Sequence, residues 1–374
     1  MRTLATGTIF DAISAPTDQQ SNAFTSLLRL RDKGYLCAFR TAAGRDKAGG
    51  RLRIMSSPDG RDWSTRNAGL TLSVSGVEGD VYAGYLSEVA PGELIGGFLW
   101  VDRSDPDLPF VNPETAGILP TSTIVATSND GGSTWFDQRV VGLLPGSGCS
   151  ITGTVIQLPD GKMALPYETW KSYDDELPGR HTASLRLSSD VGLTWPDRQI
   201  VAADPESDIF YWDQRIAKHP VSGELVAMFW THARSRGIDI QNHISWSGPD
   251  ATSWSRPVAV GWQGQHCQPL SLGGDCLAAV YVHRHHPASM RIVMSEDFGH
   301  SWINEECVFY EHPRSSGPQA GQSTQFEEFW QDMMRWQFGH PRAVTTSDGN
   351  ILVAFYAGDS DRTSMHWSLI DPCA

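Results

Sequence analysis

Residues 188–195 read SSDVGLTW, and four other segments repeat this order of serine, aspartate, usually glycine, and tryptophan. The near-copies are SPDGRDW at 57–63, SNDGGSTW at 128–135, SGPDATSW at 247–254 and SEDFGHSW at 295–302. An aspartate that opens a tight turn accepts hydrogen bonds from backbone N–H groups, and a following glycine tolerates positive φ. The phrase therefore predicts tight turns on the outer rim, each followed by a tryptophan that packs between sheets. Ala251 replaces the glycine in the fourth copy, so we expect a distorted turn there.

A second repeated element, two apolar stretches around a glycine-containing turn, is typical of a β-hairpin. It occurs at 26–40, 84–100, 153–168, 216–230, 268–281 and 341–356. Six units in 374 residues have about 62 residues each, which indicates a repeat architecture. We predict one all-β domain, 1–374, folded as a six-bladed β-propeller with four-stranded antiparallel blades. The last unit lacks the phrase, so the strand near Thr6–Asp11 is expected to complete its sheet and close the ring.

Composition limits the partners of the protein. A formal charge of −14 argues against binding to nucleic acid or to an anionic membrane surface. No apolar run approaches the roughly 18 residues of a membrane span, and no secretory h-region is visible, so we expect a cytoplasmic protein. The six cysteines lack metal-type CxxC spacing and are expected to be reduced and mostly buried. We expect no cofactor and no metal, because the histidines of HRHH (283–286) would alternate between two faces of a strand.

Residues 312–337 depart from the repeat between the fifth and sixth units. A loop, HPRSSGPQAGQ, is followed by STQFEEFWQDMMRWQ, in which Thr324 and Glu327 form a capping box ahead of helically spaced apolar residues. This insertion could be a lid, an oligomer contact or a helix packed on the rim of the last blade.

The repeated phrase resembles the Asp-box, or BNR repeat, of the sialidase superfamily, and its copies extend over nearly the whole chain. Residues 147–166 resemble the third blade of sialidases, and residues 38–60 resemble the first-blade segment whose arginine-rich loop carries the acid/base aspartate. The resemblance implies a propeller with glycosidase activity on a terminal acidic sugar. It also implies an acid/base role for Asp46.

The candidate site follows from the geometry of a propeller. One mouth of its channel is built from residues that enter the first strand and leave the second strand of each blade. In this chain those positions carry ionisable and aromatic residues, which suit an acidic carbohydrate substrate. The candidate substrate-binding residues are Arg40, Arg45, Asp80, Trp212, His232, His266, Arg284, Arg342 and Tyr356.

The resemblance fails at residues that sialidases use for chemistry. Ala23 or Asn22 stands where the first carboxylate-binding arginine belongs, and His340 stands where the nucleophilic tyrosine belongs. In the second-arginine region His232 occupies the matched place, and Arg284 alone plausibly matches a sialidase arginine. These differences argue against a tyrosine nucleophile.

Four residues are the catalytic candidates: Asp46, Glu168, Asp213 and His340. Asp46 or Asp213 would protonate the leaving oxygen, and Glu168 or His340 would activate water. Asp213 lies among aromatic residues that could raise its pKa, or it forms an ion pair with Arg215. Three functions stay open: an exo-acting glycoside hydrolase on a terminal acidic sugar, a lyase in which His340 removes the C5 proton of a uronic acid, and a non-catalytic carbohydrate-binding propeller.

Overall fold

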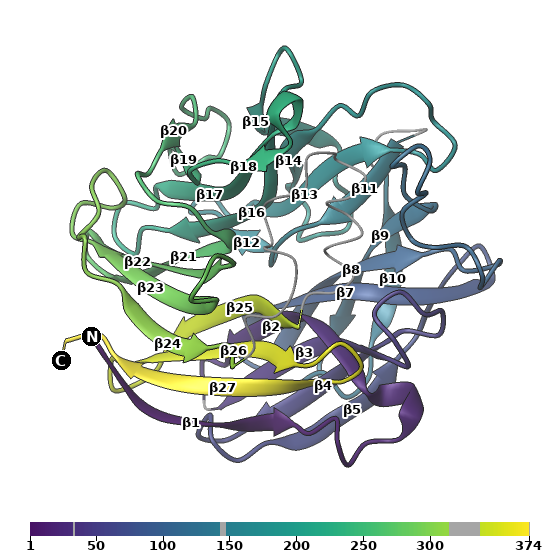
Figure 1. Ribbon diagram of the computed structural model, residues 1–374, viewed down its shortest axis with the longest axis horizontal. Helices are drawn as coiled ribbons and strands as arrows, with labels where there is room; N and C mark the ends of the chain where they lie inside the picture. The colour runs from purple at the N-terminus through teal and green to yellow at the C-terminus, as the bar shows by residue number, and fades with distance from the viewer. Residues whose placement is uncertain (33, 143–146, 314–336, 374) are drawn as a thin grey trace.

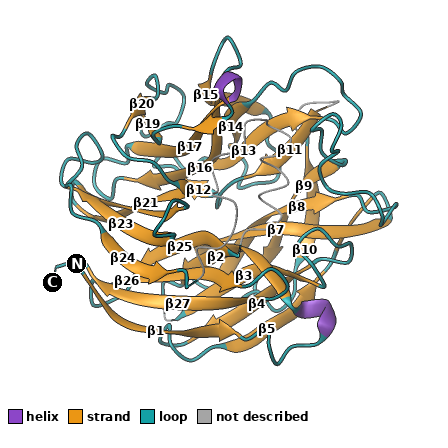
Figure 2. Ribbon diagram, in the orientation of Figure 1, coloured by secondary structure: helices purple, strands orange, loops and turns teal. Residues whose placement is uncertain are grey.

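The computed structural model describes residues 1–32, 34–142, 147–313 and 337–373. Within these ranges the chain is built of strands, with short 3-10 helices at Thr17–Gln19 and Arg234–Arg236 (Figure 2). The all-β prediction is confirmed. The insertion predicted at 312–337 lies almost wholly outside the described residues.

Four of the sheets are each formed by one continuous part of the chain. The first contains β6 (Leu72–Val74), β7 (Val77–Ala90), β8 (Glu93–Val101), β9 (Thr121–Ser128) and β10 (Phe136–Val141). The second contains β11 (Ser147–Ile151), β12 (Ile156–Gln157), β13 (Met163–Lys171), β14 (Thr182–Ser188) and β15 (Asp197–Ala203). The third contains β16 (Ile209–Lys218), β17 (Leu225–Ala233), β18 (Ile238–Asp239), β19 (His243–Ser247) and β20 (Val258–Ala259). The fourth contains β21 (Gln265–Gly273), β22 (Cys276–His283), β23 (Ser289–Ser295) and β24 (Cys307–Glu311).

An eight-stranded sheet joins the two ends of the chain. One half contains β25 (Phe338–Thr345), β26 (Ile351–Gly358), β27 (Thr363–Asp371) and β1 (Arg2–Phe10). The other half contains β2 (Ser21–Arg29), β3 (Tyr35–Ala42), β4 (Arg51–Ser57) and β5 (Ser64–Leu70). One parallel pair, Ser21 with Thr363, connects the halves, and β1 runs antiparallel to β27. The sheets lie around a common centre, so the arrangement is propeller-like (Figure 1).

The predicted hairpins are present as antiparallel strand pairs. Strand pairs β2–β3, β7–β8, β16–β17, β21–β22 and β25–β26 match five of them. The hairpin predicted at 153–168 differs, because its first strand is interrupted and both β11 and β12 pair with β13. The first strand of each hairpin, β2, β7, β11 with β12, β16, β21 or β25, is named here an inner strand, because these strands supply the residues of the axial pocket described below.

The five repeated segments, named here the outer turns, are held by local hydrogen bonds. In the copy at 188–195, Ser188 Oγ donates to Asp190 Oδ1 at 2.8 Å and accepts the Gly192 N–H at 2.8 Å. The Trp195 indole donates to the Gly192 carbonyl at 3.2 Å, and Trp195 is 7% exposed. In the fourth copy Ala251 keeps the positive φ, 58°, that Val191 and Phe298 have in their copies, but Ser247 Oγ has no hydrogen-bond partner in the described structure.

The hydrophobic core lies between successive sheets. One cluster packs Leu52 and Ile54 of β4 against Leu86 of β7 and Phe98 of β8, with Trp135 of an outer turn beside Phe98. All six cysteines are described and have free thiols, but only Cys37, Cys149 and Cys267 are buried, fewer than the sequence predicts. No described helix has the length and apolar character needed to cross a membrane.

Candidate active site

A pocket opens among the N-terminal parts of the inner strands, and we name it the axial pocket. Strands β2, β7, β11, β16, β21 and β25 contribute Phe24, Tyr82, Ile151, Asp213, His266 and His340 to its lining. Six of the residues predicted for the site line it: Arg45, Glu168, Trp212, Asp213, His266 and His340. The structure therefore brings together residues that are far apart in the sequence.

Four inner strands share a local feature, a residue with positive φ at an irregularity in strand pairing, whose side chain lines the axial pocket. Phe24, Asp213, His266 and His340 have φ between 47° and 58°, a left-handed conformation that is uncommon for residues other than glycine. Each lies at an irregularity in strand pairing, within register shifts between Ala23/Ser26, Trp212/Arg215, Gln265/Gln268 and Gly339/Arg342. Such bulges redirect side chains, and strained backbone of this kind is concentrated at functional sites.

Glu168 lies on β13 at the wall of the axial pocket. The Asp213 N–H donates to Glu168 Oε2 at 2.9 Å, so the Glu168 carboxyl contacts the backbone of Asp213 on β16. Burial raises the pKa of Glu168 to about 8, and the nearby charge of Asp213 raises it further than Arg215 lowers it. Glu168 is therefore protonated at neutral pH and can donate a proton.

Asp213 has a different environment, although it is half-buried like Glu168. Burial raises its pKa, whereas Arg215 and then Arg342 lower it. The Arg215 guanidinium forms an ion pair with Asp213 Oδ1, so the ion pair proposed from the sequence is confirmed. His266 Nε2 lies 3.9 Å from Asp213 Oδ2. The pKa of Asp213 is raised on balance, while its arginine partner favours the ionised form, which a nucleophile or a general base needs.

His266 and His340 form a close pair beside Asp213. Their ring centroids are 3.8 Å apart, and the His340 ring meets Phe24 edge to face at 4.9 Å. Burial lowers the pKa of both histidines well below the usual value. The charges of Arg215, Arg45 and Arg342 lower both further, with Arg284 also acting on His266. Both imidazoles are therefore neutral near pH 7 and can accept protons.

Aromatic side chains form much of the remaining wall. Tyr82 stacks on Phe110 with centroids 4.5 Å apart, and Trp212 meets Trp230 at 4.9 Å. The Arg45 guanidinium lies 5.5 Å from the Phe24 ring centroid and is the arginine that lines this pocket. Flat apolar faces with a few convergent polar groups are typical of small-ligand sites.

Two predicted residues lie outside the lining and hold the loop that carries Arg45. Arg40 is 1% exposed and donates to the carbonyls of Gly44, Arg45 and Lys47, while its ion pair with Asp80 measures 3.2 Å. Asp80 also accepts the N–H groups of Gly49 and Gly50. These contacts correct the substrate-binding roles of Arg40 and Asp80: both residues position the loop.

Asp46 also differs from its predicted acid/base role. Its Oδ1 accepts a hydrogen bond from Arg103 Nη2 at 2.6 Å, and its Oδ2 accepts the Phe110 N–H at 2.8 Å. Both carboxylate oxygens are thus used to fix the segment that brings Phe110 to the pocket. Asp46 is absent from the pocket lining, so the structure favours a positioning role.

Four further predicted residues are placed behind the pocket or at its other end. His232 bonds to Asp239 at 2.9 Å and stacks on Trp212, which it supports from behind. Arg284 donates to Gln265 and to the Phe338 carbonyl, and Tyr356 is buried opposite Gly339. Arg342 lines a second cavity beyond the axial pocket, which corrects its placement at the predicted mouth.

The metal-binding potential of the pocket is confined to one cluster. Among the described residues, Asp213, His266 and His340 offer ligand atoms that lie within 4.8 Å of one another. The same arginines that lower the pKa values of the histidines surround this cluster. Because they repel a dication and Asp213 is ion-paired with Arg215, the electrostatics favour an anionic ligand over a metal ion.

Sequence analysis missed several lining residues. Phe24, Tyr82, Phe110 and His181 line the pocket but carry no motif. Phe24 could have been found by alignment of the repeats, because it occupies the inner-strand position that Asp213, His266 and His340 occupy in their units. Phe110 lies in the long β8–β9 connection, outside the repeat, where no such alignment exists.

Comparisons with known proteins agree with this architecture. The family model described as a BNR repeat-like domain matches residues 107–353. No curated protein matches the chain.

Three solved structures cover nearly the whole chain. A Dyadobacter fermentans protein of unknown function is 18% identical, with a TM-score of 0.73 and coverage of 99% of this chain and 98% of its own. An α-L-arabinofuranosidase from Fusarium graminearum is 13% identical, with a TM-score of 0.65 and 98% coverage of both chains. An intramolecular trans-sialidase from Ruminococcus gnavus is 12% identical, with a TM-score of 0.60 and coverage of 98% and 97%. At these identities the likeness concerns the fold, whereas the family match spans most of the sequence, and the chain belongs to the BNR repeat-like domain family.

Proposed function

We propose that the protein is a glycoside hydrolase that removes a terminal acidic sugar in the axial pocket. The observation that carries this proposal is the pair Glu168 and Asp213, two adjacent carboxyl groups in contrasting environments. Glycosidases use two carboxyl groups, one to protonate the leaving oxygen and one to act as nucleophile or base. Burial raises the pKa of both groups, and the ion pair with Arg215 opposes the rise at Asp213, which supports different roles for the two carboxyl groups.

The proposed roles reverse those expected from the sequence. Glu168, with a pKa of about 8, would protonate the glycosidic oxygen as its bond to the sugar breaks. Asp213, held ionised by Arg215, would attack the anomeric carbon or take a proton from the attacking water. The sequence predicts Asp213 as a candidate acid and Glu168 as a candidate base. The ion pair between Asp213 and Arg215 favours Glu168 as the acid and Asp213 as the base or nucleophile.

An acidic substrate is supported by the charges around the pocket. Four guanidiniums, those of Arg45, Arg215, Arg284 and Arg342, lie near enough to His266 to lower its pKa. Arg45 lines the wall, where it can meet a sugar carboxylate, while Phe24 and Tyr82 offer flat faces to the sugar ring.

We further propose that the fold is a closed six-bladed propeller. The strand orders support six four-stranded groups, since the eight-stranded sheet divides at the single Ser21–Thr363 pair. The pairing of β1 with β27 supports closure by the N-terminal strand.

A second function, β-elimination at a uronic acid, is favoured by the histidine pair. A neutral imidazole beside several arginines can remove a C5 proton while a guanidinium neutralises the sugar carboxylate. In this alternative His340 is the base, and Asp213 keeps Arg215 in place.

A panel of uronic-acid and sialic-acid glycosides, assayed with the wild type, Asp213→Asn and His340→Ala, separates these functions. Hydrolysis predicts release of the sugar without absorbance from an unsaturated uronate, and a large loss of turnover in Asp213→Asn. Absorbance from an unsaturated uronate that is abolished in His340→Ala would replace the hydrolase proposal by the lyase. Saturable glycan binding without turnover of any substrate would leave a binding protein.

A further inference from the structure

A second cavity, of about 330 Å³, lies next to the axial pocket, and we name it the basic cavity. The same inner strands line both, but the basic cavity takes residues further along each strand. Arg215 follows Asp213, Gln268 follows His266 and Arg342 follows His340. The two cavities are therefore at successive levels along the inner strands. Tyr85 lies between them, with the guanidinium carbons of Arg342 and Arg215 at 4.6 Å and 5.6 Å from its ring centroid.

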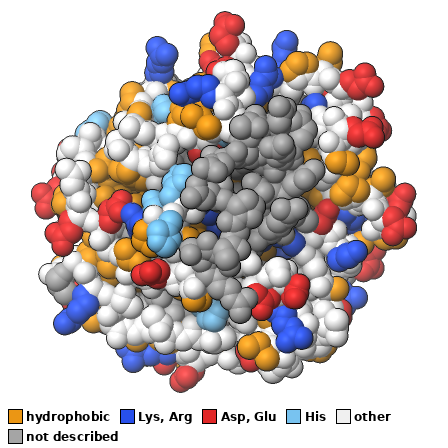
Figure 3. Space-filling view, viewed as in Figure 1, with side chains coloured by type: hydrophobic (Ala, Val, Ile, Leu, Met, Phe, Trp, Pro, Cys, Tyr) orange, Lys and Arg blue, Asp and Glu red, His pale blue; other side chains and the backbone are white. Residues whose placement is uncertain are grey.

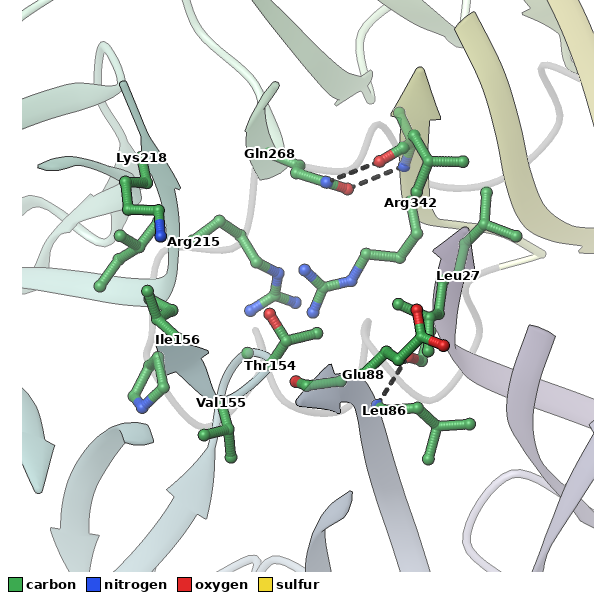
Figure 4. Close-up of a pocket in the computed structure, with 18 of the residues that line it drawn as sticks. Leu27, Leu86, Glu88, Thr154, Val155, Ile156, Arg215, Lys218, Gln268 and Arg342 are labelled. Atoms are coloured by element: carbon green, nitrogen blue, oxygen red, sulfur yellow. Dashed lines mark hydrogen bonds between the residues drawn. The ribbon is translucent and has the colours of Figure 1, made fainter. Parts of the chain in front are cut away.

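Two buried arginines converge in the basic cavity. Arg215 is 2% exposed and Arg342 is 7% exposed, and their guanidiniums point toward one another above Thr154 (Figure 4). Burial, followed by the charge of Arg215, lowers the pKa of Arg342 to about 10, which still leaves it charged at neutral pH. Lys218 adds a third positive charge to the lining, with its ammonium on the Gln157 carbonyl at 2.7 Å.

Little negative charge balances these groups. Among the described residues, Asp213 is the sole carboxylate that forms an ion pair with either arginine. Glu88 lines the basic cavity, but its carboxylate accepts the N–H groups of Arg31 at 2.6 Å and Gly92 at 3.1 Å. The cavity thus holds more positive than negative charge in a setting where water screens poorly.

The arginines also keep hydrogen-bonding capacity. Arg342 donates from Nε to the Thr25 carbonyl at 3.2 Å and from Nη2 to the Thr152 carbonyl at 3.1 Å. Arg215 Nη1 donates to Thr152 and to Asp213, whereas its buried Nη2 has no hydrogen-bond partner in the described structure. A buried charged donor without an acceptor is costly, so an oxygen ligand for it would be stabilising.

We infer that the basic cavity binds a small oxyanion, such as phosphate or a short carboxylate, between Arg215 and Arg342. Guanidinium groups bind planar and tetrahedral oxyanions through paired charge-assisted hydrogen bonds. Leu27, Val155 and Ile156 supply the apolar part of the lining and leave the anion to the two arginines and Lys218. Arg215 also forms the ion pair with Asp213, so an anion in the basic cavity and Asp213 would bind the same guanidinium. Binding of the anion would therefore change the net charge beside the axial pocket.

Calorimetric titration of the full chain with inorganic phosphate at constant ionic strength tests the inference, with sulfate and acetate as further arms. We expect saturable binding at one site per chain. Arg342→Gln should weaken it about tenfold or more, because one charge-assisted pair of hydrogen bonds is lost. The matched control is Arg45→Gln, which removes an arginine from the axial pocket and should leave phosphate binding within about twofold.

A second variant keeps the test decisive if Arg342→Gln folds poorly. Thr154→Glu would place a carboxylate below the two guanidiniums, so it should raise the unfolding temperature relative to Thr154→Gln and abolish phosphate binding. The inference is overturned if no anion binds the wild type, if binding survives both Arg342→Gln and Thr154→Glu, or if Arg45→Gln abolishes it. None of these readouts uses turnover, so failure here is separate from failure of the proposed hydrolase.

Discussion

The pKa values of carboxyl groups are shifted in opposite directions in the outer turns and in the axial pocket. In the outer turns, hydrogen bonds from Thr134 and Thr194 lower the pKa values of Asp130 and Asp190 to about 2. In the axial pocket, burial raises the pKa of Glu168 to about 8. The Asp190 carboxylate accepts hydrogen bonds from both the N–H and the hydroxyl of Thr194, whereas the half-buried Glu168 carboxyl accepts the Asp213 N–H and is desolvated.

In this fold the repeated residues lie in the outer turns, whereas the candidate catalytic residues lie in the axial pocket and differ from unit to unit. The outer turn recurs in five units, and in the copy at 188–195 the serine donates to the aspartate while the tryptophan donates to the Gly192 carbonyl. The axial positions do not repeat: Phe24, Asp213, His266 and His340 occupy equivalent left-handed positions with different side chains. Charged side chains of both signs are spread around the perimeter of the molecule, as Figure 3 shows for one face.

The largest expected effect is on turnover. Glu168→Gln should lower kcat by about 10²–10⁴-fold, because it removes the proposed proton donor without a change of size. Steady-state kinetics on the substrate found in the glycoside panel measures this. Glu206→Gln, the same change at an exposed residue that does not line the pocket, should have no effect. Equal activity of Glu168→Gln and the wild type would contradict the acid role.

The second prediction concerns stability at neutral pH. Glu168 has a folded pKa of about 8 against an ordinary value of 4.5, so the folded state holds a proton that the unfolded state releases. Stability should therefore fall as pH rises from about 4.5 to about 8, by at most about 1.4 kcal/mol per pH unit, and by less because Glu168 is partly exposed. Urea unfolding across this range should show a flatter profile for Glu168→Gln. A profile unchanged by the substitution would show that the carboxyl ionises normally.

A matched pair of substitutions sharpens the description of the outer turns. Ser188→Ala should destabilise the fold by about 1–2 kcal/mol, because the Gly192 N–H loses its acceptor in a buried site. Ser247→Ala should have little effect, since Ser247 Oγ has no hydrogen-bond partner in the described structure. Thermal unfolding of the two variants measures the difference. Equal losses would mean that the fourth turn is as well bonded as the third.

The smallest expected effect appears in acid. The pKa of Asp190 is about 2 in the folded protein against an ordinary 3.8, so its contribution to stability is complete above about pH 4 and is lost as pH falls toward 2. Asp190→Asn should remove part of the pH dependence of the unfolding midpoint in this range and leave the neutral range unchanged. If Asp190→Asn also changed the unfolding midpoint near neutral pH, the stability effects of the outer turns and of the axial pocket would not be separate.

The sequence predicted one part of the candidate site and misplaced another. Asp213, His266 and His340 were found because they precede apolar hairpin strands at equivalent places in their units. Asp46, Arg40 and Asp80 are also ionisable residues, yet their side chains are already bonded within the protein. Asp46 accepts from Arg103, Arg40 donates to loop carbonyls, and Asp80 accepts backbone N–H groups. Residue type shows that a side chain can bind a ligand, but its own hydrogen-bond partners decide whether it remains available.

The sequence by itself determined the repeated turns, the hairpins and the all-β class. Each of these depends on interactions within a few residues, such as Ser188 with Asp190, so the local pattern contains the needed information. Only the tertiary structure decided that Glu168 accepts the Asp213 N–H, which of its two predicted environments Asp213 has, and that Arg342 faces the basic cavity. Protonation states and pocket walls depend on the water removed and the charges brought near by distant segments, and no local pattern specifies either.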